Sequence, residues 1–173
     1  FPLLLIFAIL FSPISSSAQA MRTVQQVVYG DRLVLDNGES VQALGVWAPK
    51  PDPGKKDFKP DSAMGAGERR SREFTQGLLQ GRQIWLTYGD PAKDSQGNSL
   101  ALIYFKVDSS QNLGGGGQQV SLGSGTYMLN RLLLSYGFAE ADNKANTSYK
   151  VEFQQLQNEA VMGKRGNWQM MMP

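Results

Sequence analysis

The order of apolar patterns along the chain constrains its fold more than any other feature. Strand-like apolar runs predict five strands, at residues 24–29, 33–35, 41–46, 83–88 and 100–106. Helical spacing predicts three helices, at residues 67–80, 127–136 and 149–162. An Asn-Gly turn at 37–38 joins the second and third strands as a hairpin. Three strands, a helix, two strands and two helices are typical of a small α+β domain built on a five-stranded barrel.

Residues 1–20 differ in composition from the rest, because they contain no charged side chain. An apolar run at 3–11 is followed by Ser12-Pro13, a run of serines and Ala18-Gln19-Ala20, which is the layout of a secretory signal peptide. The alternatives are an uncleaved membrane anchor and a buried helix of the domain itself. Export predicts a periplasmic, lumenal or extracellular location for a domain over 21–168, with a tail at 169–173.

Cysteine and histidine are both absent from the 173 residues. Their absence excludes disulfides, the usual zinc sites, and Ser-His-Asp or Cys-His catalysis, which leaves carboxylates, Lys, Arg, Tyr and hydroxyls as reactive groups. A domain of this size buries enough surface to fold without cross-links. The net charge of +2 is too small to indicate a nucleic-acid partner by itself.

Two segments are predicted to lie outside the regular elements. Residues 49–66 contain four prolines and few apolar residues, which predicts an exposed loop. Residues 109–125 are rich in Gly, Ser and Gln, with four consecutive glycines at 114–117, which predicts a flexible insertion. The insertion is therefore expected to bury little apolar surface.

Four short motifs occur in order at residues 29–35, 42–50, 96–101 and 159–168. Together they make the chain from Val24 to Trp168 resemble the staphylococcal nuclease (thermonuclease) family. The resemblance implies an OB-type five-stranded barrel with three helices, in agreement with the order of apolar patterns. It also implies hydrolysis of phosphodiester bonds in DNA or RNA with one calcium ion, held by carboxylates, with a glutamate as base and two arginines on the phosphate.

Most metal and base positions of the family are replaced in this sequence. Asp31 matches the first calcium ligand, although it also suits a plain turn aspartate after Gly30. Trp47 stands where the resemblance places the second aspartate, and Ala48 where the family often has threonine. Lys50 stands where the family has its glutamate. Because one carboxylate of three is left beside an added lysine, we expect weak or no metal binding and no cofactor, with calcium only if the chain is a nuclease.

The two phosphate-binding arginines of the family are replaced by Gln42 and Asn98. Loss of one such donor commonly costs about 10²- to 10³-fold in rate, and here both are lost together with the base. The resemblance therefore implies a pseudoenzyme without catalytic residues at the family positions. A rearranged site that uses Asp52 and the arginines within 69–72 is the alternative.

Candidate binding residues are one aromatic side chain and a group of basic ones. Trp47 is either an exposed binding aromatic or a core or cleft-filling side chain. The basic group consists of Lys55, Lys56 and Lys59 in the loop with Arg69, Arg70 and Arg72 in the first helix. This group either forms a face for an acidic partner or is an ordinary solvated surface.

The leading hypothesis is a catalytically inactive thermonuclease-like domain, exported or anchored through residues 1–20, that serves as a structural or accessory subunit of a larger, membrane-associated protein complex. The first alternative is a weak or divergent secreted calcium-dependent nuclease that needs Asp31 or Asp52. The second is a non-catalytic domain that binds single-stranded nucleic acid on its barrel. Export disfavours this last function, because nucleic acid is not the usual ligand outside the cell.

Overall fold

The computed structural model describes residues 20–51 and 63–170. Four parts of the sequence predictions lie outside these residues: positions 1–19 of the expected signal peptide or anchor at 1–20, Asp52, the three loop lysines, and the end of the expected tail. Among the residues described, no helix is long and apolar enough to cross a bilayer.

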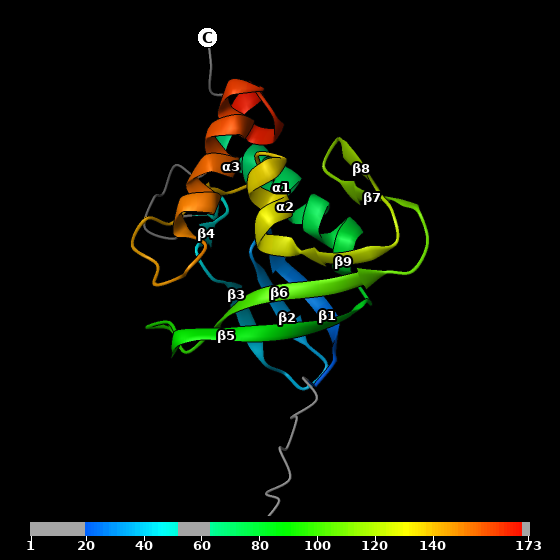
Figure 1. Cartoon of the computed structure of the whole chain (residues 1–173), viewed down its shortest axis with the longest axis vertical. Helices are drawn as coiled ribbons and strands as arrows, with labels where there is room; N and C mark the ends of the chain where they lie inside the picture. Colours follow the sequence, from blue (N-terminus) through cyan, green and yellow to red (C-terminus); the bar gives the residue numbers. More distant parts are fainter. Residues whose placement is uncertain (1–19, 52–62, 171–173) are drawn as a thin grey trace, which may run out of the picture.

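Five strands close into a barrel, as the order of apolar patterns predicts. They are β1 (Arg22–Tyr29), β2 (Arg32–Leu35), β3 (Ser40–Ala43), β5 (Gln83–Lys93) and β6 (Ser99–Val107). The strands follow the order β3-β2-β1-β5-β6, and parallel pairing of β3 with β6 completes the ring. A further strand, β9 (Gly125–Met128), pairs with β6 and extends the sheet beyond the ring. Figure 1 shows the barrel below the helices. The predicted five-stranded barrel is confirmed.

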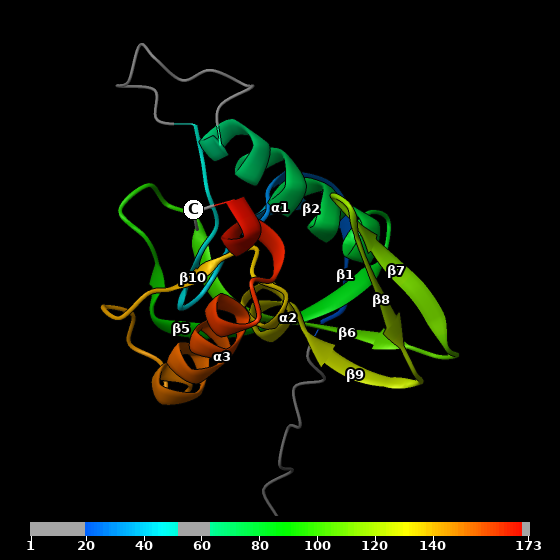
Figure 2. The ribbon, with the colours of Figure 1, turned by 90° about the horizontal axis from the view of Figure 1, so that it is seen from above.

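Three α-helices pack over one end of the barrel in the described part of the chain, α1 (Ala63–Leu79), α2 (Leu129–Ser135) and α3 (Lys150–Met162). A 3-10 helix at Gly166–Met170 follows α3. Seen from above, α2 lies between α1 and α3 (Figure 2). Phe74 and Leu78 of α1 are buried in the core, as their helical spacing predicts. The helix α1 begins at Ala63, so residues 63–66 of the expected loop belong to its first turn.

The third predicted strand is divided in two by the backbone at Gly45, where φ is +76°. Residues 40–43 form β3, whereas Val46–Trp47 form a separate strand β4 that pairs with β10 (Glu140–Ala141). A positive φ suits glycine because it has no Cβ. This break directs the chain away from the barrel, and Trp47 and Lys50 follow it.

The glycine-rich segment 109–125 forms a packed hairpin, so the prediction of a flexible insertion at these residues is wrong. Its strands β7 (Gln111–Gly115) and β8 (Gln118–Leu122) pair antiparallel, and the hairpin lies along α1 in Figure 2. A Cβ at Gly115 would lie 2.5 Å from the carbonyl oxygen of Glu73 in α1. Val120 and Leu122 are buried in the core. Glycine here permits close contact between two backbones.

Candidate functional site

Asp31 lies at the turn between β1 and β2 and is fully buried, with an exposed fraction of 0%. The helix α1 packs on this turn: a Cβ at Gly30 would lie 2.7 Å from Ser71 Cβ, and Thr75 Oγ1 donates to the carbonyl oxygen of Gly30 at 2.6 Å. A buried carboxylate needs charged or hydrogen-bonding partners to offset its lost hydration. Asp31 is therefore more than an exposed turn residue.

The partners of Asp31 come from the chain that leaves β4. The backbone N–H of Ala48 donates to Asp31 Oδ2 at 2.9 Å, and Lys50 Nζ lies 2.9 Å from the same oxygen. The Lys50 side chain is 19% exposed, so the ion pair is largely shielded from water. The ammonium of Lys50 thus meets the carboxylate that the resemblance assigns to calcium.

Gln42 joins this pair from β3. Its Oε1 accepts from Lys50 Nζ at 3.2 Å and from Arg32 Nε at 3.3 Å. Arg32 lies directly across from Gln42 in the β2–β3 pairing. The structure therefore brings Asp31, Lys50 and Gln42 together, and adds Arg32.

Arg32 is a residue that the sequence analysis missed. Its position follows from the hairpin register, since Arg32 and Gln42 lie symmetrically about the turn at Asn37. Hairpin turns fix such cross-strand pairs, so the Asn-Gly turn was the signal that could have found it. The guanidinium also lies over the Tyr29 ring at 5.6 Å, and its NH2 donates to Gln96 Oε1 at 3.2 Å.

Asn98, at the other arginine position of the family, has a structural environment. Its Oδ1 accepts from Ser40 Oγ at 2.8 Å, and its Nδ2 donates to Asp94 Oδ2 at 2.8 Å. Burial raises the pKa of Asp94, but hydrogen bonds from Asn98 and from the backbone of Gln96 outweigh this effect and bring the pKa below its usual value. Asn98 therefore holds the turn between β5 and β6 together.

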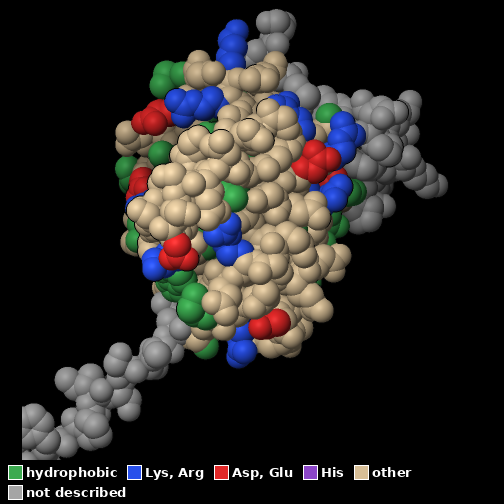
Figure 3. All heavy atoms as spheres, turned by 90° about the vertical axis from the view of Figure 1, so that its right-hand side faces the viewer, with side chains coloured by type: hydrophobic (Ala, Val, Ile, Leu, Met, Phe, Trp, Pro, Cys, Tyr) green, Lys and Arg blue, Asp and Glu red, His purple; other side chains and the backbone are tan. Residues whose placement is uncertain are grey.

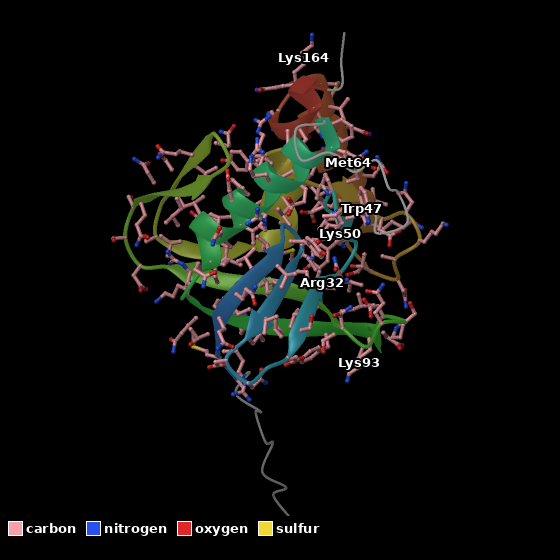
Figure 4. All side chains as sticks on the ribbon, turned by 180° about the vertical axis from the view of Figure 1, so that it is seen from behind. Arg32, Trp47, Lys50, Met64, Lys93 and Lys164 are labelled. Carbon is pink, nitrogen blue, oxygen red and sulfur yellow. The ribbon has the colours of Figure 1, made fainter. Side chains whose placement is uncertain are left out.

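Trp47 is 44% exposed and lines an open cleft of about 780 Å³ between β3 and β4, the β5–β6 turn and the segment at 140–146. Figure 4 shows Trp47, Lys50 and Arg32 following one another along this side of the molecule. The charged residues of the cleft are Arg32, Lys50 and Lys144 with Asp90, Asp94, Glu140 and Asp142. The cleft thus carries both signs of charge and is not a basic groove. The neighbour Ala48 is buried and exposes no polar group.

The basic residues of α1 do not form one free face. Arg70 Nε donates to the carbonyl oxygen of Gly116 at 3.0 Å, and Arg72 Nε lies 3.0 Å from Glu68 Oε1. Arg69 is exposed. Lys55 and Lys56 lie outside the described residues. The face on the β7–β8 side carries scattered charges of both signs among uncharged polar groups and backbone (Figure 3).

The residues of the site do not fit calcium. The described part of the chain contains no group of three or more Asp, Glu, His or Cys side chains that could hold a metal. Asp31 Oδ1 is buried and lacks a hydrogen-bond partner among the described residues, which is the one feature that suits a cation. Calcium needs six to eight oxygen ligands, and the other oxygen of Asp31 already contacts an ammonium group.

Comparison with protein families identifies the family of this chain. The model of the family described as "Staphylococcal nuclease homologue" matches residues 40–170. A search of curated proteins finds no match for the chain. The matched range runs from β3 to the 3-10 helix and covers most of the 173 residues. It includes three of the four motifs described above, those at 42–50, 96–101 and 159–168. The chain belongs to the staphylococcal nuclease homologue family.

Proposed function

We propose that this domain does not hydrolyse phosphodiester bonds and serves as a structural or accessory subunit of a larger protein complex. The observation that carries the first part is the 2.9 Å contact between Lys50 Nζ and Asp31 Oδ2. It supports a site in which a lysine occupies the contact that a metal would need.

Electrostatics argues against adding a metal to this pair. A divalent cation and an ammonium group about 5 Å apart repel by roughly 7 kcal/mol at an effective dielectric constant near 20. Asp31 is the only carboxylate that contacts Lys50 within the described residues, so no second acidic group offsets this repulsion. A metal would first have to displace Lys50 from a buried partner.

The general base and the phosphate-binding groups of the reaction are also missing from the described part of this site. An ammonium group that donates to Asp31 and Gln42 has no lone pair with which to accept a proton from water. Arg32 brings one guanidinium to the cleft, but it supplies neither a base nor a metal ligand. The four carboxylates of the cleft oppose the approach of a polyanion, which also weighs against the nucleic-acid-binding alternative.

The subunit role rests on the intact scaffold and on the apolar segment at 1–20. A domain that keeps its core while its reactive groups are replaced can still bind partner proteins through its surface, although it no longer catalyses the reaction. An apolar segment without charges suits export or anchoring at a membrane. We therefore place the domain on the periplasmic, lumenal or extracellular side, with protein partners.

A digestion assay on the purified full chain tests the loss of activity. We expect no cleavage of single- or double-stranded DNA or of RNA at any calcium concentration. Calcium-dependent cleavage that Asp31→Ala abolishes would contradict the proposal and support the divergent nuclease.

Native purification from the source membrane fraction in mild detergent tests the subunit role. We expect the chain to migrate with other chains in a fixed ratio, as measured by native mass and peptide identification. A free, soluble chain that begins near Met21 would contradict this part of the proposal.

A further inference from the structure

Arg32 has an unusual environment for a half-buried guanidinium, because neutral groups hold it. Gln42 Oε1 accepts from its Nε, and Gln96 Oε1 accepts from its NH2. No carboxylate lies within ion-pair distance of Arg32 in residues 20–51 and 63–170. A guanidinium presents five donors in a rigid fork, and two amide oxygens leave part of that fork unused.

The charge of Arg32, which lines the cleft, has no ion-pair partner among the described residues. Lys50 shares the Gln42 oxygen with Arg32, but Asp31 already neutralises Lys50. Asp94 is near enough to Arg32 for a weak Coulombic effect, yet its carboxylate is taken up by hydrogen bonds from Asn98 and Gln96. The fork of Arg32 is therefore oriented in advance for an anion from outside the chain.

Trp47 supplies the apolar part of the same cleft. It is 44% exposed, and Val46 and Ala141 line the cleft with it. Trp47 and Arg32 thus line the same cleft, and tryptophan and arginine are among the residues that most often dominate binding energies at protein interfaces. A volume of about 780 Å³ has room for several side chains of a bound segment.

We propose that the cleft binds a segment of a partner protein through one of the carboxylate side chains of that segment, which pairs with Arg32, while Trp47 provides apolar contact in the same cleft. The charge pattern selects this ligand. A nucleic acid carries repeated phosphates, which Asp90, Glu140 and Asp142 in the cleft would repel. A peptide can instead place one carboxylate against Arg32 and uncharged or basic side chains against these three acidic residues. This inference rests on the proposed function, because it names the partner chemistry of the same site.

Peptide libraries test the ligand class on the full chain. One capped pentapeptide library has Asp fixed at its centre, and a matched library has Asn there. NMR signals of the Arg32 side chain and the Trp47 indole report binding. We expect the Asp library to shift both signals, and the Asn library to bind about tenfold more weakly or worse, because it lacks the charge-assisted hydrogen bond. Equal shifts by both libraries, or none by the Asp library, would overturn the inference.

An oligothymidine serves as the probe for the competing ligand class. We expect no shift of the Arg32 signal with this probe at the salt concentration used for the peptides. A shift that Arg32→Gln removes would overturn the peptide inference in favour of nucleic acid.

Matched variants link the cleft to the native complex. We expect Arg32→Gln and Trp47→Ala to release the chain from co-purifying partners. Arg22→Gln makes the same charge change on an exposed residue of β1, outside the cleft, and is expected to leave the complex unchanged. Arg32→Lys separates charge from geometry, since lysine lacks the fork.

The outcomes of the variant experiment separate this inference from the proposed function. A complex that forms with wild type and equally well with Arg32→Gln overturns the inference and leaves the subunit role standing. The absence of any complex with wild type overturns the subunit role. Circular dichroism of each variant shows whether it is folded. The peptide experiment tests the role of Arg32 on the wild-type chain, so it does not depend on the folding of the variants.

Discussion

Replacement of Lys50 measures how much the ion pair with Asp31 contributes to the stability of the domain. In Lys50→Met the carboxylate of Asp31 stays buried, and its one remaining partner among residues 20–51 and 63–170 is the N–H of Ala48. Removing one member of a buried ion pair costs several kcal/mol, because the other charge is left uncompensated. We expect the free energy of unfolding, measured by urea denaturation, to fall by about 2 to 4 kcal/mol.

The control is the double variant Asp31→Asn with Lys50→Met, which removes both charges. We expect it to recover a large part of the lost stability, and a double-mutant cycle gives the coupling between the two residues. A Lys50→Met variant as stable as wild type would show that the ion pair contributes nothing.

At the residue scale, part of the site could be predicted from the sequence. The motifs identify Asp31, Gln42 and Lys50 as a group, and the structure brings them into contact. Arg32 was missed because its contact with Gln42 depends on the register of β2 and β3. The role of Asn98 was missed because its partners, Ser40 and Asp94, are set by packing between β3 and the β5–β6 turn.

The hairpin β7–β8 is an element whose packing on α1 can be tested by one glycine pair. At Gly116, where φ is +63°, an added Cβ would clash with the backbone of Arg70. At Gly117, where φ is +81°, an added Cβ meets nothing within 4 Å. Both alanine variants carry backbone strain of about 1 to 2 kcal/mol, and Gly116→Ala adds roughly 1 to 3 kcal/mol of overpacking.

Thermal unfolding of the two variants measures this difference, and hydrogen exchange localises it. We expect Gly116→Ala to lose protection in β7 and β8, whereas Gly117→Ala keeps it. Equal effects of the two substitutions would mean that the hairpin does not rest on α1.

The turn between β5 and β6 gives a pH-dependent test through Asn98→Ala. Because the folded-state pKa of Asp94 is lowered, Asp94 adds stability above the ordinary pKa of 3.8, and this is lost as the pH falls through the lower folded-state pKa. The variant loses the side-chain hydrogen bond, so its Asp94 pKa moves back toward 3.8. Denaturation at several pH values should show a stability gap at neutral pH that narrows below pH 3.8; a gap independent of pH would contradict this.

At the scale of elements, predictions from amino-acid composition were wrong where the packing of one backbone on another decides the structure. Four consecutive glycines are typical of flexible linkers, yet at 114–117 they let a hairpin approach α1 closely. The two-residue strands β4 and β10 were not predicted, because two residues carry no periodicity. These short strands nevertheless place Trp47 at the cleft.

At the scale of the whole molecule, the barrel was predictable because each of its strands carries its own apolar run and the order of elements leaves few topologies. The closing pair, β3 with β6, joins residues far apart in the sequence, and it follows from that order together with the family resemblance. What the sequence could not provide is the charge pattern of the cleft. That pattern arises where β3, β4, the β5–β6 turn and the segment after β10 meet.

Calcium titration of the full chain tests the central claim, which is that Lys50 and not a metal ion neutralises Asp31. Any ligand that binds the folded state alone raises the unfolding temperature with its concentration. We predict no saturable heat in calorimetry and no rise in unfolding temperature as calcium is added. A rise that saturates with calcium and disappears in Asp31→Ala would contradict the account.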